Sequence, residues 1–233
     1  MEGAVSRAPA RRCYKFLGAG GVGRFSRYRW PLPVDERPGA WVSVQGDLEP
    51  CRNGVHACQV RDLPYWLDDE LWVAEAAEPV LEHDGVLVAR RARLLWRVEA
   101  WSQLVAQAFA QVCAWRARDH AILALRRAGR ERDADALERC ADLGDIPRVV
   151  AAITGGDQAV QVAGYASDAA EYAPKYPLAT ALIAARTAGA ALHPARAVAG
   201  YRSERDWQAR WLAERLHLEA PDRPWGAASG AGP

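Results

Sequence analysis

The sequence predicts an α+β protein, with a small β-rich N-terminal unit followed by an all-helical C-terminal unit. Short β-type runs separated by prolines fill the first hundred residues, whereas apolar residues recur at helical spacing after about Ala100. Strands cluster first and helices follow, and this order argues against alternating βαβ units. We expect a flexible arm over 1–12, an α+β domain over 13–99, a helical domain over 100–219 and a disordered tail over 220–233.

The strands of the first unit are predicted from three runs, CYKFL (13–17), WVSV (41–44) and LWVAEAAE (71–78). The segment at 85–99 contains β-branched residues and fits one long strand, or a strand followed by a helix. DLPYWLDDEL (62–71) could form a single helical turn. Proline removes a helix donor and clashes with the preceding turn. Long helices are therefore excluded by Pro31, Pro33, Pro38, Pro50, Pro64 and Pro79.

The helices of the second unit are predicted from apolar spacing and from capping residues. One face of the first helix carries residues three and four apart, namely Trp101, Leu104, Val105, Ala108, Val112 and Trp115. Asp119 is a plausible cap for a second helix that ends at Gly129. Further helices are expected at 133–142, 146–154, 157–172, 177–190 and 195–217. In the last of these, an apolar stripe of Trp207, Trp211 and Leu218 is expected to face the core.

Composition and charge narrow the class of protein. Half of the residues are hydrophobic, a quarter are charged, and the formal net charge is +1. No overall attraction to nucleic acid or to a membrane follows, so nucleic acid is not favoured as a partner. No run reaches the roughly 20 apolar residues that span a bilayer, and the N-terminus lacks the apolar core of a secretory signal. We expect a cytoplasmic protein whose five cysteines are free thiols or metal ligands rather than a disulfide framework.

The local charge near the N-terminus differs from this average. In the first thirty residues only Glu2 opposes the basic residues, which are Arg7, Arg11, Arg12, Lys15, Arg24, Arg27 and Arg29. Such a bias is typical of a solvated basic arm. It is also typical of a surface that contacts an anion or a nucleic acid.

Gly18, Gly20 and Gly23 have the G-x-G-x-x-G spacing of a dinucleotide-binding turn and follow a predicted strand. That motif requires a helix after the glycines, whose amides point at a pyrophosphate, and an acidic residue about 20 positions on. Here the prolines that follow exclude the helix, and Asp35 lies in a loop before the next strand. We therefore interpret the glycines as a flexible loop between two strands. A phosphate could still be held by the loop amides together with Arg24, Arg27 or Arg29.

CRNGVHAC (51–58) is the least ordinary stretch of the chain. His56 and Cys58 lie two apart, so they share a face of an extended segment, and Asn53-Gly54 favours a turn that brings Cys51 back toward them. With Cys13 from the first strand they could form a Cys3His zinc site, although the paired C-x-x-C pattern is absent. A thiol activated by His56 is a second interpretation. In the third, both cysteines are buried structural residues and His56 bonds to a loop carbonyl.

The same stretch resembles an uncharacterised domain family of bacteria and their phages, whose members carry a C-x-x-G-F-H-A-C segment. Cys51, Gly54, His56, Ala57 and Cys58 match that segment, while Val55 replaces the aromatic residue. The strand at 71–78 is similar to the family's next strand, with Glu75 at its acidic position. CYKFL looks like the family's first strand, which a loop follows. The resemblance covers about residues 13–98 and implies no established activity.

Three hypotheses about function follow. In the first, the protein is a bacterial or phage-related accessory protein. Its α+β module binds an anionic small molecule or a protein partner, its helical unit mediates assembly, and the ligand-binding candidates are Tyr14, Arg24, Arg27, Arg29 and Arg52. In the second, it is an NAD-using transferase whose layout is similar to ADP-ribosyltransferases. Glu75 and His56 would then be its catalytic residues, with Tyr14 beside them. In the third, it is a small zinc domain with a helical adaptor. Convergence of His56, Cys58 and Glu75 on one pocket would favour an enzyme.

Overall fold

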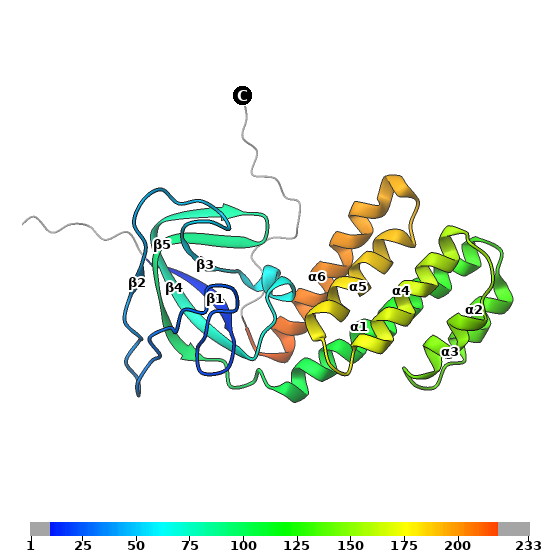
Figure 1. Cartoon of the computed structure of the whole chain (residues 1–233), viewed down its shortest axis with the longest axis horizontal. Coiled ribbons are helices and arrows are strands. Elements are labelled where there is room, and N and C mark those ends of the chain that lie inside the picture. The colour runs from blue at the N-terminus through cyan, green and yellow to red at the C-terminus, as the bar shows by residue number, and fades with distance from the viewer. Residues whose placement is uncertain (1–9, 219–233) are drawn as a thin grey trace, which may run out of the picture. The chain divides into compact units, whose positions relative to one another are not determined.

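The computed structural model describes residues 10–218, and the chain divides between Ser102 and Gln103 into two compact units (Figure 1). An antiparallel sheet forms the first unit and helices form the second, so the predicted α+β class is confirmed. The expected tail and residues 1–9 of the expected arm lie outside the described residues. The last two residues of that arm were assigned wrongly. Arg11 and Arg12 begin strand β1, because they pair with Ala76 and Glu75 across the sheet.

Two long strands organise the first unit. β4 (Glu70–His83) and β5 (Val86–Arg97) form an antiparallel hairpin that turns at Asp84-Gly85, so 85–99 contains one long strand and no helix. β1 (Arg11–Leu17) pairs with the first half of β4. β2 (Val42–Ser43) and β3 (Val55–Ala57) both pair with β5. A short 3-10 helix, η1 (Val60–Tyr65), provides the predicted helical turn.

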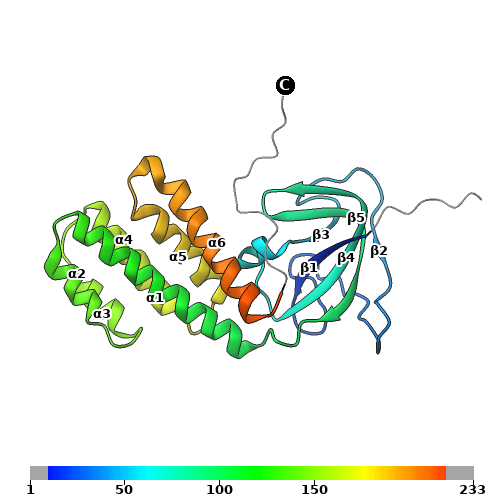
Figure 2. The same cartoon turned by 180° about the vertical axis from the view of Figure 1, so that it is seen from behind.

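The sheet closes on itself at Tyr14 and Cys58. The amide of each residue donates to the carbonyl of the other, and both N···O distances are 2.8 Å. This bridge joins β1 to the chain just after β3, which is itself paired with β5. The neighbours therefore form a ring, β1–β4–β5–β3–β1, and the two long strands curl around it (Figure 2). The interior of this ring is occupied by buried hydrophobic side chains.

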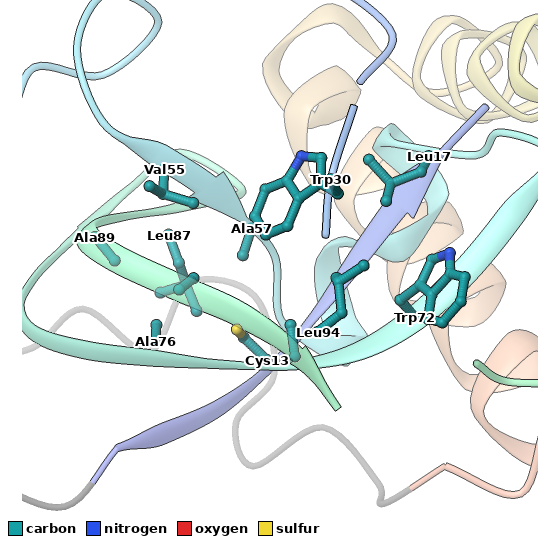
Figure 3. Close-up of a cluster of buried hydrophobic side chains, with 12 residues drawn as sticks. Cys13, Leu17, Trp30, Val55, Ala57, Trp72, Ala76, Leu87, Ala89 and Leu94 are labelled. Carbon is teal, nitrogen blue, oxygen red and sulfur yellow. The ribbon is translucent and has the colours of Figure 1, made fainter. Parts of the chain in front are cut away.

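Alternating side chains fill that interior (Figure 3). Cys13 and Leu17 of β1 point into the cluster with Leu87 and Leu94 of β5. Trp30 and Trp72 are the bulky members, and the rest of the space is lined by small residues, namely Ala57, Ala74, Ala76, Ala89 and Ala92. Small residues beside two indoles allow close packing inside so narrow a ring.

Lys15 lies at the seam where the ring closes. It falls between Cys13 and Leu17 in the alternation of β1. Its ammonium donates to the carbonyl of His56 at 2.6 Å and lies 5.1 Å from the centre of the Trp30 ring. Burial lowers the pKa of Lys15 to about 8, against the opposing effect of the neighbouring thiols.

The second unit is built around one long helix, α1 (Gln103–Arg127), which contacts four of the helices that follow it. The helices that follow α1 are α2 (Glu131–Glu138), α3 (Asp145–Ala152), α4 (Gln158–Tyr172), α5 (Pro177–Ala190) and α6 (Ala197–Arg215), with the 3-10 turn η2 (Pro194–Arg196) before α6. Many of the buried side chains are alanines, which allow the helix axes to approach closely. The prolines at 147 and 177 lie in first turns, as predicted.

Two details of this unit differ from the sequence prediction. Asp119 does not cap a second helix, because α1 has no glycine or proline between its ends and continues through it to the stop at Gly129. The buried face of α1 is also shifted from the predicted stripe, since Leu104 is 78 % exposed. Smaller side chains make the contacts instead, among them Ala110, Cys113, Ala114 and Ala117.

The position of Lys15 predicts a pH dependence. Its pKa is about 8 in the folded protein against an ordinary value of about 10.4. The unfolded chain therefore binds this proton more tightly, and raising the pH between these values favours folding. We expect the unfolding free energy of the wild type, relative to Lys15→Met, to rise by about 2 kcal/mol between about pH 8 and about pH 9.5. Urea denaturation of both proteins measures it, and a pH-independent difference would contradict the assignment.

Candidate functional site

The glycine segment forms a compact turn that binds the chain's own carboxylates. Gly20 and Gly21 adopt left-handed backbone angles, with φ of 70° and 73°. The amides of Ala19, Gly20 and Gly21 all donate to side-chain carboxylates. Ala19 donates to Asp69 at 3.0 Å, while Gly20 and Gly21 donate to the two oxygens of Glu70 at 3.0 and 3.1 Å.

These contacts correct the expectation that the loop amides hold a ligand phosphate. The amides do form an anion-binding nest, but Glu70 occupies it. The Glu70 carboxylate is buried and also accepts from the indole nitrogen of Trp72 at 3.1 Å. The loop is therefore anchored to the start of β4, and only side chains remain available for a ligand.

Residues 24–29 protrude beyond that anchored turn and all are exposed. The Gly23 amide donates to the Tyr28 carbonyl at 2.8 Å, and the Arg27 amide donates to the Gly23 carbonyl at 2.9 Å. Phe25 is 81 % exposed, the largest fraction for a big apolar residue in the described chain. We call residues 24–29 the basic loop. Its backbone is held in one conformation while its arginines and aromatic rings face solvent.

The arginines of the basic loop have different surroundings. Arg24 donates to the carbonyl of Leu67 at 3.0 Å, so it helps to fix the loop. Arg27 and Arg29 have no carboxylate partner within residues 10–218. Arg24 and Arg27 line a hollow of about 560 Å³ together with Asp68 and Asp69. Burial raises the pKa of Asp68 above its ordinary value.

The segment 51–58 has a structural part in ring closure. His56 Nε2 lies 3.0 Å from the amide of Cys51, and since an amide can only donate, the ring is neutral with its proton on Nδ1. Burial and the Lys15 ammonium lower the pKa of His56. The Cys58 thiol donates to the Tyr14 carbonyl, and burial raises its pKa well above the ordinary value. Cys58 therefore lacks the lowered pKa that a thiol activated by His56 would have.

The candidate zinc ligands are not grouped. Cys51 is exposed, whereas Cys13 points into the ring interior, where burial raises its pKa to about 12. Over residues 10–218, no three or more His, Cys, Asp and Glu side chains are arranged to hold a metal ion. All five cysteines are free.

The two candidate catalytic residues are also apart. Glu75 lies beside Arg93 in the sheet register, whereas His56 lies beside Val88 on the opposite edge of β5. The five-residue offset along β5 corresponds to about 17 Å. Glu75 forms an ion pair with Arg93. His56, Cys58 and Glu75 therefore do not share a pocket, and the geometry gives the NAD-transferase hypothesis no support.

The remaining ligand-binding candidates are separate from the basic loop. Tyr14 is buried at the seam. Arg52 projects from the loop before β3 and pairs with Glu49 at 3.1 Å, with 77 % of its side chain exposed. Of the five candidates, only Arg24, Arg27 and Arg29 lie together.

Sequence reasoning missed a buried polar cluster in the helical unit. Glu204 of α6 is 1 % exposed and accepts two hydrogen bonds from Arg116 of α1 at 2.7 and 2.9 Å. His120 Nε2 lies 3.1 Å from the same carboxylate. Burial opposes ionisation of Glu204, but these contacts outweigh it and hold its pKa below the ordinary value. Trp207 and Trp211 contact α1 as expected, whereas Leu218 lies beyond the end of α6.

Comparison with family models, with curated proteins and with solved structures finds no match to this chain. The resemblance of residues 13–98 to the phage family therefore stays a prediction. None of the helices within residues 10–218 has the length and apolar character needed to cross a membrane.

The geometry of the turn predicts which glycine substitutions lower the unfolding free energy. Gly18 has an ordinary φ, and an added Cβ would meet its nearest atom at 3.4 Å, so Gly18→Ala should change the unfolding free energy by less than about 0.5 kcal/mol. Gly21 needs its positive φ, and an added Cβ would lie 2.5 Å from Leu32, so Gly21→Ala should cost about 1–2 kcal/mol. Urea denaturation of both variants tests this order. The reverse order, expected for a dinucleotide fingerprint in which Gly18 is essential, would contradict the turn described.

Proposed function

We propose that this protein is a non-enzymatic binding module that recognises an anionic ligand or partner through the basic loop. The proposal rests on one observation, which is that the basic loop combines a fixed backbone with exposed arginine side chains. Arg27 and Arg29 extend from a backbone fixed by hydrogen bonds and lack carboxylate partners within residues 10–218. Binding to groups that are already positioned costs less conformational entropy than binding to a mobile arm.

The exposed aromatic rings support the same proposal. Phe25 and Tyr28 alternate with the three arginines, and Tyr28 is 47 % exposed. Aromatic and arginine side chains together are the residues that dominate binding energy at recognition surfaces. An exposed phenyl ring such as that of Phe25 is not expected in a basic segment whose only role is to be solvated.

In this proposal the helical unit mediates assembly. Support comes from three exposed tyrosines in and just after α4, namely Tyr165, Tyr172 and Tyr176. Tyrosine is enriched at protein interfaces because it combines apolar area with a polar tip. An accessory role in a bacterium or a phage, in the cytoplasm, belongs to the proposal and rests on the resemblance of residues 13–98 and on the composition.

Charge-neutral substitution of the basic loop tests the proposal. We expect Arg27→Gln with Arg29→Gln to weaken binding of a nucleoside triphosphate or of heparin by about tenfold or more, because two charge-assisted contacts are lost. Isothermal titration at low salt measures the affinity. Since Gln has a Cβ like Arg, the positive φ of Arg27 is equally accommodated in the variant.

Arg52→Gln is the matched control, because it removes an exposed arginine of the same unit away from the loop. It should leave the affinity within about twofold of the wild type. An equal loss in the control and in the loop variant, or no binding of either anion by the wild type, would exclude the basic loop as the binding site.

A further inference from the structure

A second set of arginine and aromatic side chains lies on the outer face of the sheet. The interior residues Cys13, Ala74 and Leu94 alternate with Arg12, Glu75 and Arg93, so the latter point outward. Trp41 precedes β2 and falls beside Arg93 in the register, and Trp96 lies further along β5. We call Arg12, Trp41, Arg91, Arg93 and Trp96 the arginine–tryptophan face.

Direct contacts connect these side chains across the sheet. The guanidinium groups of Arg91 and Arg93 each lie 4.7 Å from the centre of the Trp41 ring. Arg12 lies 5.7 Å from the centre of the Trp96 ring. Glu75 bonds to Arg93 between them. The planar cations are thereby held against aromatic surfaces, which fixes long side chains that would otherwise move freely.

The charge on this face is unbalanced. Glu75 is the carboxylate that contacts the face from within residues 10–218, and it is engaged by Arg93. Arg91 has no carboxylate partner within residues 10–218; its contact is the Trp41 ring, which a second cation shares. Two guanidinium groups drawn to one indole repel each other, and an anion placed beside them relieves that repulsion.

The chemistry of the face selects among anions. A free phosphate or an acidic peptide would bind the arginines but would leave the exposed surface of Trp96, a residue that is 49 % exposed, without a stacking partner. A nucleotide chain supplies both groups, since its phosphates bind arginine and its bases stack on aromatic rings and guanidinium planes. From β1 to β2 the face spans three strand spacings, roughly 15 Å, or about four nucleotides at the spacing of stacked bases.

We propose that the arginine–tryptophan face binds single-stranded nucleic acid, with phosphates at Arg91 and Arg93 and a base stacked on Trp96. This goes beyond recognition of an anion by the basic loop, because the two sets of residues are separate. Arg12 lies near the start of β1, whereas the basic loop begins at Arg24, seven residues after β1 ends at Leu17, so the two sets belong to different segments of the chain.

Fluorescence anisotropy with labelled oligonucleotides of about 15 nucleotides tests the proposal, with parallel arms of oligo-dT and oligo-U. We expect Trp96→Ala to weaken binding about tenfold with an unchanged salt dependence, because it removes stacking but no charge. Arg91→Gln should lower the slope of log affinity against log salt by about 0.7, the value for one phosphate contact on a single strand. Trp96→Phe retains a ring and should recover most of the loss.

Circular dichroism of each variant checks that the sheet is intact, and Arg52→Gln is the charge-matched control. The proposal is overturned if the wild type binds neither oligonucleotide at about 50 mM salt, or if Trp96→Ala binds as the wild type does, which would indicate a charged surface without base recognition. It is also overturned if binding is lost in Arg27→Gln with Arg29→Gln but kept in the face variants. That last outcome would leave the basic loop as the binding site and so separates the two proposals.

Discussion

The N-terminal unit depends on one contact, the exchange of main-chain hydrogen bonds between Tyr14 and Cys58. Without it, β1 and β3 would be the open edges of a curled sheet, with unpaired amides and carbonyls that invite other strands. With it, the sheet becomes a ring, and the alternation of each strand separates a packed interior from a charged exterior. The unusual segment 51–58 has a structural explanation in this closure. Its histidine accepts from the Cys51 amide, its carbonyl at 56 accepts from Lys15, and its last cysteine makes the bridge.

The amides of the glycine turn also bind groups of the same chain. A nest of amides at positions 19–21 has the geometry that recognises phosphate in other proteins, but here Asp69 and Glu70 fill it. In the proposed function, the ligand is recognised by the side chains that follow the turn and not by the backbone amides of the turn. Because the amides hold the start of β4, the arginines beyond them extend from a fixed base. The glycine motif, whose spacing suggests a dinucleotide cofactor, thus anchors the basic loop to the sheet.

The sequence predicted the fold through its local patterns and missed the features that depend on distant partners. Strand alternation, the prolines and the stop at Gly129 identified most elements, because each acts within a few residues. Ring closure joins positions 44 residues apart, and no local pattern indicates it. The same reason explains why Lys15 and Glu204 were not expected inside. A charged residue is buried only when partners compensate it, and those of Glu204 come from a helix 84 and 88 residues away. The alternation of residues in β5 is enough to place Arg91 and Arg93 on the outer face. Their shared contact with Trp41 could not be predicted from that strand alone.

The net charge of +1 argues against a polyanion as partner, whereas the proposal for the arginine–tryptophan face depends on how individual charges are paired. Net charge counts every carboxylate equally, although many are engaged within the fold. Glu70 binds backbone amides, Glu75 binds Arg93, and Glu204 binds Arg116 and His120. Carboxylates used in this way contribute little to the field at exposed sites on other parts of the surface. Arg27 and Arg29 of the basic loop and Arg91 of the arginine–tryptophan face, in contrast, have no carboxylate partner within residues 10–218. Which charges remain without partners, rather than their sum, determines what such a surface attracts.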